Sequence, residues 1–472
     1  MSNLDDLHGN VIRTAFALWY GWKPYGQHAA LLEKTQWWAW SEIQALQMRK
    51  LNTLLEYAYA NVPFYRRRFD EAGVRPRAIH TPADLVHLPP LTKQEIQDHR
   101  DELLASGVNG RRLRQNHTGG STGQPLTFYQ DGRFQAWANA DLLRTYRMAG
   151  YQLGMRWAFL WGSDYDARTH KGWHGRLMDR LVYNALWINT FDLSVDTLTD
   201  AARQLVRFQP QILVAYVSSA TLLAQFVRDK GIEGIQPQAI QTSAEVLTPD
   251  DRRLLEETFG CQVFDRYGCR EVYNIAHECA AHQGLHVLAE NNVVECLDAD
   301  GRPAVPGTVG RIVVTNLNNY VMPFIRYEVG DLGVPSQRSC GCGRGLPLLD
   351  SVMGRTTDVI TSPSGKLLHG EFFTHLFYKL PSVRQFRVVQ KTRVDLLVQV
   401  VPGPGFDKHA SFTFLEKAIH RYGDPGFQVR FELCDHIPPA SSGKYRFTIS
   451  HVPLSVGKDD RSAAHISSTH AI

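Results

Sequence analysis

Short apolar segments alternate with helix-forming segments in the middle of this chain, and this alternation limits the possible folds more than any other feature. The segments RWAFLW, QILVAY and CQVF have the length and apolar content of buried strands. Two helix-forming segments precede CQVF, and the second has Thr248 in the N-cap position with Pro249 directly after it. Alternation of this kind predicts an α/β fold with helices on the faces of a sheet.

The regions on either side of this core have other patterns, and together they predict four parts of the chain. Residues 1–110 are expected to be a helical segment of a large N-terminal domain, because apolar residues recur at helical spacing up to Pro63. Residues 111–355 would form the strand-and-helix core. Residues 356–455 alternate strand-like segments with one helix-like segment, which predicts a small α+β domain. The polar tail 456–472 is expected to be disordered.

The composition excludes several classes of protein. The formal net charge is +4 and the basic residues are scattered, so we expect no nucleic-acid groove. No apolar run approaches the ~20 residues of a membrane helix, and the first ten residues are too polar for a secretory signal. Seven cysteines in a long chain do not suggest a disulfide framework. These features predict a cytoplasmic globular protein.

A stretch rich in glycine and hydroxyl groups, TGGSTGQP at residues 118–125, is the first candidate site. Glycines let the main chain turn tightly and expose its N–H groups, and the hydroxyls of Thr118, Ser121 and Thr122 add donors. Such a loop can enclose a polyphosphate, although an ordinary turn has a similar composition. It is not the P-loop motif, because Gln124 stands where a phosphate loop would favour lysine.

Four motifs follow this loop in order, namely DRYGCRE, RYEVGD, GRTTD and SSGKYR. With the earlier segments NVPFYRRRFDEAGV and LPPLTKQEI, the ordered set resembles the adenylate-forming superfamily. The resemblance is closest to its phenylacetate–CoA ligase-like branch, which has relatives in capsule gene clusters, and it extends from Leu51 to Pro453. It implies a large N-terminal domain of layered sheets and helices followed by a small mobile α+β domain. It also implies formation of an acyl-adenylate from a carboxylic acid and ATP.

The resemblance assigns the phosphates and the metal ion to two of these motifs. The loop residues Thr118, Gly120, Ser121, Thr122 and Gly123 would hold the β- and γ-phosphates of ATP. Glu271 would hold Mg²⁺, since a hard cation that bridges phosphate oxygens needs a carboxylate.

The nucleoside would lie against the other motifs. Tyr267 offers a flat face to adenine, and residues 243–245 would line the adenine side. The carboxylate of Asp331 suits the ribose diol because it accepts two hydrogen bonds at once. The full set of expected nucleoside-binding residues is Ser243, Ala244, Glu245, Asp265, Arg266, Tyr267, Gly268, Asp331 and Arg355.

Lys444, in SSGKYR, would be the catalytic cation of the C-terminal domain. By resemblance it would bridge the substrate carboxylate and the α-phosphate, since attack of one anion on another needs a cation between them. Three positions depart from the family pattern. Gln124 removes a cation from the phosphate loop, Arg270 replaces the usual Thr or Ser before the metal-binding acid, and Thr357 occupies the hinge position.

Cysteines and a histidine in two turn-rich segments form a second candidate site. Cys279 and His282 are a C-x-x-H pair, and Cys340 and Cys342 are a C-x-C pair. Three thiolates and one imidazole suit tetrahedral Zn²⁺, and four protein ligands would make the ion structural. Similar pairs in this family branch favour the assignment.

Two other histidines, His277 and His286, are alternatives for the nitrogen ligand. Such a site would join the hairpin after Glu271 to the loop after Asp331, and would keep the two acids in register.

These observations predict an ATP- and Mg²⁺-dependent ligase that adenylates an aryl or acyl carboxylic acid and transfers it to a thiol. Coenzyme A is the acceptor that the resemblance implies, and a carrier-protein thiol or an amine is the alternative. The alternative from another class is a non-catalytic nucleotide-binding or scaffold protein with a decayed site, which Gln124 and Arg270 favour. A homodimer is compatible with the sequence.

Overall fold

The computed structural model describes residues 24–108, 113–117, 126–161, 184–190, 195–355, 359–438 and 446–452, except 366, 370–371, 374–375, 378 and 381. The chain divides into two compact units. The larger comprises Met1–Glu295, Val313–Val329 and Ser336–Ser351, and the smaller comprises Cys296–Ile312, Gly330–Pro335 and Val352–Ile472. The smaller unit thus includes two segments that precede residue 356, and the four boundaries expected from the sequence stay a prediction.

One large sheet contains eleven of the described strands, in the order β10-β11-β12-β13-β9-β8-β7-β6-β5-β3-β4. The strands that run parallel to their neighbours are β3 (Trp157–Trp161), β4 (Ala185–Asn189), β5 (Ile212–Tyr216), β6 (Ala239–Ser243) and β7 (Gln262–Cys269). Antiparallel pairing continues from β7 through β8 (Tyr273–Glu278), β9 (Leu285–Val287) and β13 (Leu348–Arg355). The remaining strands are β10 (Asn292–Leu297), β11 (Gly310–Asn316) and β12 (Tyr327–Pro335).

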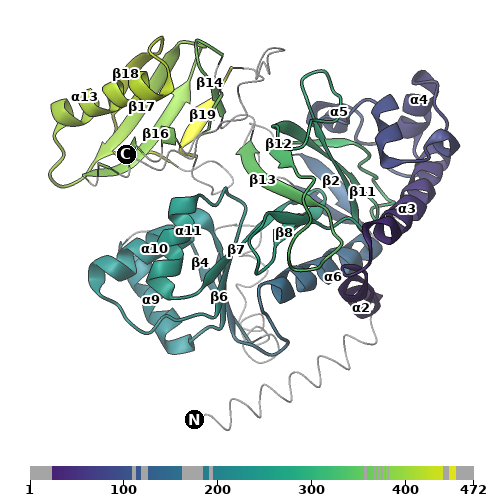
Figure 1. Ribbon diagram of the computed structural model, residues 1–472, viewed down its shortest axis with the longest axis horizontal. Coiled ribbons are helices and arrows are strands. Elements are labelled where there is room, and N and C mark those ends of the chain that lie inside the picture. Colours follow the sequence, from purple (N-terminus) through teal and green to yellow (C-terminus); the bar gives the residue numbers. More distant parts are fainter. Residues whose placement is uncertain are drawn as a thin grey trace, which may run out of the picture. The chain divides into compact units, whose positions relative to one another are not determined.

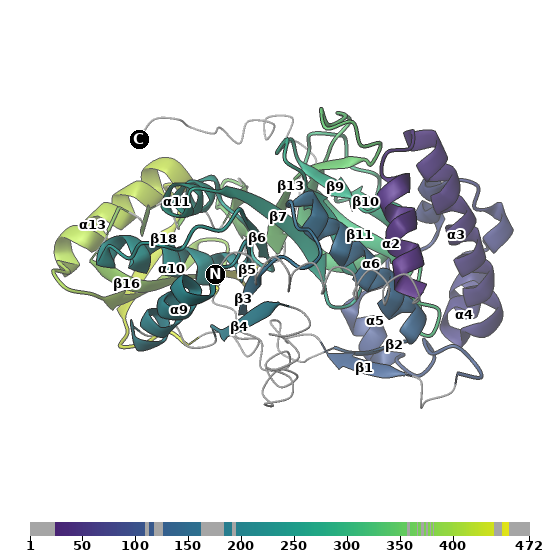
Figure 2. The ribbon, with the colours of Figure 1, turned by 90° about the horizontal axis from the view of Figure 1, so that it is seen from below.

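Helices cover both faces of the parallel strands, because alternate residues of a strand point in opposite directions. Leu213 and Ala215 of β5 pack in a buried cluster with α9 (Val195–Phe208), α10 (Val217–Lys230) and α11 (Pro249–Phe259). Ile212 and Val214 pack in another cluster with α2 (Pro24–Thr35) and α6 (Gly132–Met148). Figure 1 shows α9, α10 and α11 grouped beside β4 and β6, and Figure 2 shows α2 next to α6. The predicted α/β class is confirmed.

Local signals in the sequence mark the ends of several helices. Thr248 caps α11, since its Oγ1 accepts a hydrogen bond from the Asp251 N–H at 3.0 Å. Thr92 and Glu95 form a capping box at the start of α5 (Lys93–Asp98). The other N-terminal helices are α3 (Trp40–Asn61), α4 (Pro63–Glu71), η1 (Pro76–Ala78) and η2 (Pro82–His87). None of the helices in the described ranges is both long enough and apolar enough to cross a membrane.

A short hairpin carries the glycine-rich loop. Its strands β1 (Arg114–His117) and β2 (Thr127–Gln130) pair antiparallel, with His117 opposite Thr127. Residues 118–125, which contain all five expected phosphate-binding residues, connect these strands and lie outside the described residues.

The C-terminal part of the smaller unit contains a sheet of its own, in the order β18-β17-β16-β19. These strands are β16 (Val383–Gln390), β17 (Asp395–Pro402), β18 (Gln428–Leu433) and β19 (Thr448–Ser450), and the helical elements are α13 (Lys408–Ala418) and η5 (Ile419–Gly423). A further strand pair is β14 (Val359–Thr361) with β15 (Leu367–His369). Val388, Val398 and Leu415 share one buried cluster, so α13 packs on this sheet. A small α+β domain follows the larger body, as predicted.

Candidate active site and cysteine–histidine cluster

The ends of two neighbouring parallel strands bring together several residues of the expected nucleotide site. β6 pairs with β7 so that Thr242 lies opposite Asp265, and Ser243 lies opposite Arg266. The Nε of Arg266 donates a hydrogen bond to Ser243 Oγ at 3.3 Å. Ligands of α/β sheets bind at the carboxyl ends of parallel strands. This edge of the sheet is therefore the candidate active site.

Gly268 is required by the shape of the hairpin that leads to Glu271. A Cβ at this position would lie 2.3 Å from the carbonyl oxygen of Tyr273 on the paired strand. The pairing of β7 with β8 also shifts by one residue between Tyr267 and Gly268. Glycine thus permits the close approach of the two strands, and it is not required by an unusual φ angle.

The turn after β6 is joined to the start of α10. Ala244 has a φ of 73°, which is rare for a residue with a side chain. The next residue, Glu245, accepts hydrogen bonds from the Ser218 N–H at 2.7 Å and from Ser218 Oγ at 3.0 Å. A carboxylate at a helix N-terminus satisfies free N–H groups and is stabilised by the helix dipole. Glu245 therefore fixes the left-handed turn, and its expected contact with adenine stays a prediction.

Asp265 lies in a desolvated environment beside another carboxylate. Desolvation raises the pKa of Asp265 to about 7, and the nearby Glu278 contributes to the shift. The Asp265 N–H donates to Glu278 Oε2 at 2.8 Å, and Arg252 binds both oxygens of Glu278 at 2.9 and 2.8 Å. This ion pair therefore anchors the main chain of β7 just before the nucleotide-site residues.

Glu271, the expected Mg²⁺ ligand, is held by its side chain and by its main chain. It is 5% exposed, and its Oε1 accepts a hydrogen bond of 2.7 Å from the hydroxyl of Tyr327, which is fully buried. The Nε2 of Gln130 donates to the carbonyl oxygens of Arg270 at 3.1 Å and Glu271 at 3.3 Å. A buried carboxylate with an oxygen bound in this way is a suitable hard ligand for a divalent cation.

The other expected site residues lie elsewhere. Asp331 lies in β12 and is half-buried, and Arg355 is the last residue of β13. Both belong to the smaller unit. Lys444 and Thr357 lie outside the described residues, as do Gln124 and the rest of the glycine-rich loop.

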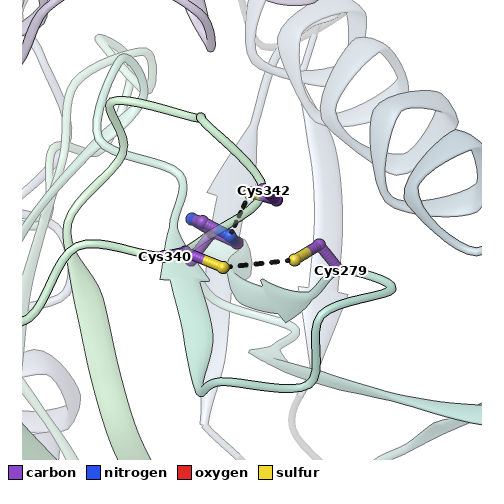
Figure 3. Close-up of side chains that lie close together, drawn as sticks. Cys279, Cys340 and Cys342 are labelled. Carbon is purple, nitrogen blue, oxygen red and sulfur yellow. Dashed lines mark hydrogen bonds between the residues drawn. The ribbon is translucent and has the colours of Figure 1, made fainter.

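Three cysteines and one histidine form a compact cluster in the larger unit. Their potential ligand atoms, from Cys279, His286, Cys340 and Cys342, all lie within 4.8 Å of one another. The Sγ atoms of Cys279 and Cys340 are 3.6 Å apart, and Cys342 Sγ is 3.4 Å from His286 Nε2 (Figure 3). Figure 3 shows the side chain of Cys279 facing those of Cys340 and Cys342, which come from another loop.

These separations match the edges of a tetrahedral zinc site. Bond lengths of about 2.3 Å to sulfur and about 2.0 Å to nitrogen give tetrahedral edges of roughly 3.5–3.8 Å. Burial lowers the pKa of His286 to about 4, so its imidazole is neutral at pH 7 and can donate a lone pair to a metal. Burial also raises the pKa of Cys279 to about 12, and a bound metal cation would stabilise the thiolate form.

The histidine of this cluster is His286, one of the two alternatives expected from the sequence, and His282 lies outside the cluster. The ring of His282 lies instead beside Phe264, at a centroid separation of 5.1 Å, and its Nδ1 is 3.3 Å from Arg252 Nη1. The physical reason is strand pairing. β9 pairs with β13 so that His286 lies opposite Leu348, which places its ring near the loop that carries Cys340 and Cys342. The C-x-x-H spacing does not contain this information.

Two residues that support Glu271 were not found from the sequence. Tyr327 stands in the motif RYEVGD, four residues before Asp331, and Gln130 ends the strand directly after the glycine-rich loop. Their closeness to two candidate motifs is the only signal of their roles that the sequence contains.

Comparison with known proteins identifies the family. The phenylacetate–coenzyme A ligase of Thermus thermophilus is 30% identical to this chain over 328 residues, which are 68% of this chain and 72% of that ligase. The chain belongs to the phenylacetate–coenzyme A ligase family. The chain is also similar to protein CapK of Staphylococcus aureus, which is 24% identical over 416 residues and matches 87% of this chain and 90% of CapK.

Two further comparisons agree with this assignment. Residues 360–451 of this family member match the model of the CapK C-terminal domain. The structure of 2-hydroxyisobutyryl-CoA ligase in the postadenylation state aligns with a TM-score of 0.71 at 21% identity, covering 87% of this chain and 90% of that chain. The two proteins therefore share an adenylate-forming fold.

Proposed function

We propose that this chain is an ATP- and Mg²⁺-dependent ligase that adenylates an aryl or acyl carboxylic acid and transfers the acyl group to coenzyme A. The observation that carries the proposal is the placement of Glu271. In a member of the phenylacetate–coenzyme A ligase family, this buried acid follows directly after the strand ends that hold Asp265–Gly268. A decayed site would not be expected to keep a buried carboxylate held on two sides.

The proposed reaction has two steps. A carboxylate oxygen of the acid attacks the α-phosphorus of ATP, and the bond to pyrophosphate breaks. The thiol sulfur of coenzyme A, once deprotonated, then attacks the acyl carbonyl carbon, and AMP leaves with the bonding electrons. In this proposal Lys444 stabilises the first step and Asp331 and Arg355 bind the ribose, as the family resemblance implies. Bound Mg²⁺ would neutralise charge on the phosphate oxygens.

Glu271 fits the role of metal ligand. Its Oε1 is bound by Tyr327, whereas no side chain of the described residues donates a hydrogen bond to Oε2. Within the described ranges, one oxygen thus has a protein partner and the other accepts no side-chain hydrogen bond, an arrangement that suits a cation ligand.

The test is ATP–pyrophosphate exchange with a panel of aryl and short acyl acids, followed by transfer assays. Exchange that requires both Mg²⁺ and one class of acid is the expected result. Coenzyme A, a phosphopantetheine carrier protein and simple amines are then compared as acceptors. Absence of exchange with every acid of the panel would contradict the proposal and favour a non-catalytic role.

We also propose that the cluster of Cys279, His286, Cys340 and Cys342 binds a structural zinc ion. Four protein ligands leave no open position for a substrate, so such an ion would stabilise the fold and take no part in the reaction. A cytoplasmic location and a homodimer stay predictions from the sequence.

A further inference from the structure

The direction of the Glu271 carboxylate is set by a residue from a distant part of the chain. Tyr327 and Glu271 are 56 residues apart, and both side chains are buried, so their 2.7 Å hydrogen bond forms away from competing water. Hydrogen bonds to an ionised acceptor are roughly twice as strong as bonds between neutral groups. Because the hydroxyl binds Oε1, it holds the carboxylate in one orientation toward a cation.

The main chain on both sides of Tyr327 is held by contacts with other parts of the larger unit. The preceding residue, Arg326, has a φ of 54° and forms a two-point ion pair with Glu295, at 3.0 and 2.8 Å. Leu91 binds this segment on the other side, since its N–H donates to Arg326 O at 2.7 Å and its carbonyl accepts from the Glu328 N–H at 2.9 Å. The tyrosine is thus a rigid support.

The main chain of Glu271 is held by the strand that follows the glycine-rich loop. Gln130, the last residue of β2, is 1% exposed, and its amide donates to the carbonyls of Arg270 and Glu271. Its Oε1 faces Asn116 Nδ2 of β1 at 3.4 Å. One amide therefore connects both strands of the β1–β2 hairpin to the residue expected to bind the metal ion.

We infer that Tyr327 and Gln130 are positioning residues for the metal-binding carboxylate of Glu271. Tyr327 sets the direction of the Glu271 carboxylate. Gln130 fixes the position of the Glu271 main chain relative to the hairpin that carries the glycine-rich loop. A metal ion between protein and phosphate would need the carboxylate and the main chain of Glu271 both in place, since its ligand distances tolerate little variation. The inference rests on the proposed function and adds two positioning residues to the proposed metal site.

The main experiment measures ATP binding, apart from turnover, in Tyr327→Phe. Isothermal titration calorimetry gives the Kd of ATP with Mg²⁺ and with EDTA for the full-length protein. We expect the Kd of ATP in EDTA to stay near that of wild type. The factor by which Mg²⁺ lowers this Kd should itself fall about tenfold, which corresponds to the loss of one hydrogen bond to a charged group. The Mg²⁺ concentration for half-maximal pyrophosphate exchange should be higher in this variant than in wild type.

Tyr65→Phe is the matched control. Tyr65 is also buried, and its hydroxyl donates to Pro323 O and accepts from the Ile325 N–H, both at 2.9 Å, without contact to a carboxylate. Loss of this hydroxyl should lower thermal stability and leave the gain in affinity from Mg²⁺ unchanged. An equal loss of that gain in Tyr327→Phe and Tyr65→Phe would show that Tyr327 only packs, and would overturn its positioning role.

Gln130→Met tests the second residue, because it keeps the length of the side chain and removes both donors. We expect a rise in the Kd of Mg²⁺·ATP that is larger than the rise in the Kd of ATP in EDTA. Equal rises in the two constants would overturn the role of Gln130.

Glu271→Gln separates the inference from the proposed function. If this variant loses the gain from Mg²⁺ while Tyr327→Phe and Gln130→Met keep it, the proposed function stands and the positioning roles are wrong. If wild type shows no gain from Mg²⁺, the proposed metal role of Glu271 fails, and the inference fails with it.

Discussion

At the scale of single residues, Lys50 is a cation held in a desolvated network of polar and charged groups. It lies in α3, and its Nζ donates to Glu290 O at 2.7 Å and Asn291 Oδ1 at 2.9 Å. Next to it, Arg144 of α6 pairs with Asp141 and Glu290, each at 2.7 Å, and these side chains are almost fully buried. The network joins two helices to the segment between β9 and β10. Because this network is buried, the free energy of unfolding should depend on the protonation state of its groups.

Lys50→Met should change the pH dependence of stability. Burial lowers the pKa of Lys50 to about 7, although Asp141 and Glu290 oppose the shift. An unfolded lysine keeps its proton up to about pH 10.4. Between pH 7 and pH 10 the unfolded chain thus binds more protons than the native chain, and Lys50 makes the free energy of unfolding rise with pH. Wild type should therefore gain stability relative to Lys50→Met over this interval.

Urea unfolding at pH 7, 8, 9 and 10 measures this difference. Lys391→Met, at an exposed position, is the control and should follow wild type at every pH. Parallel pH profiles of wild type and Lys50→Met would contradict the prediction.

At the scale of elements, the β7–β8 hairpin connects the nucleotide-site residues to Glu271. Gly268→Ala places a Cβ against the main chain of Tyr273, and overpacking of this kind costs about 1–3 kcal/mol. Since the hairpin must open to relieve the contact, we expect lower stability together with a raised KM for ATP. Thermal unfolding and pyrophosphate exchange measure the two effects.

Gly132→Ala is the control for this substitution, because a Cβ at that position in α6 meets no atom within 4 Å. Its stability and its KM for ATP should stay close to those of wild type. An unchanged KM in Gly268→Ala would show that the hairpin shape does not affect the nucleotide site.

The cysteine–histidine cluster joins the turn between β8 and β9 to the loop before β13. The purified protein should contain one zinc ion per chain by mass spectrometry of metals. His286→Gln and Cys340→Ser should lose the ion and unfold at lower temperature, because the free energy of metal binding contributes to folding. Treatment of wild type with a strong chelator should also remove the ion and lower the unfolding temperature.

His282→Gln is the informative comparison for that experiment, since His282 contacts Arg252 and lies outside the cluster. This variant should retain zinc. Loss of the ion from His282→Gln, with retention in His286→Gln, would reverse the assignment of the nitrogen ligand.

At the scale of the whole molecule, residues of both units enter the proposed reaction. Glu271 and Tyr267 belong to the larger unit, whereas Asp331 and Arg355 belong to the smaller one. Lys444 lies outside the described residues. The proposed reaction assigns Lys444 to the adenylation step alone, so we expect the two half-reactions to depend on different residues.

Lys444→Ala should separate these half-reactions. Formation of acyl-AMP should fall by about 10²–10³-fold, because a charge that stabilises the transition state is lost. Transfer from chemically supplied acyl-AMP to coenzyme A should be retained. Single-turnover assays of each step measure this, with Lys417→Ala, at an exposed position of α13, as the control. Equal losses in both steps would contradict a role restricted to adenylation.

The sequence by itself determined the fold class and the ends of several helices. Strand and helix alternation and the cap at Thr248 are local patterns, and both were confirmed. Local patterns suffice here because capping and periodicity depend on residues within one or two turns. The order of motifs also indicated the family, which a relative with 30% identity confirmed.

Only the tertiary structure decided how distant residues meet. The choice of His286 over His282 depends on the pairing of β9 with β13, and the support of Glu271 depends on Tyr327 and Gln130, 56 and 141 residues away in the chain. Strand order and register are set by packing across the whole sheet, since side chains alternate between its faces. No short stretch of sequence contains that information, so the partners of Glu271 became visible only in the folded chain.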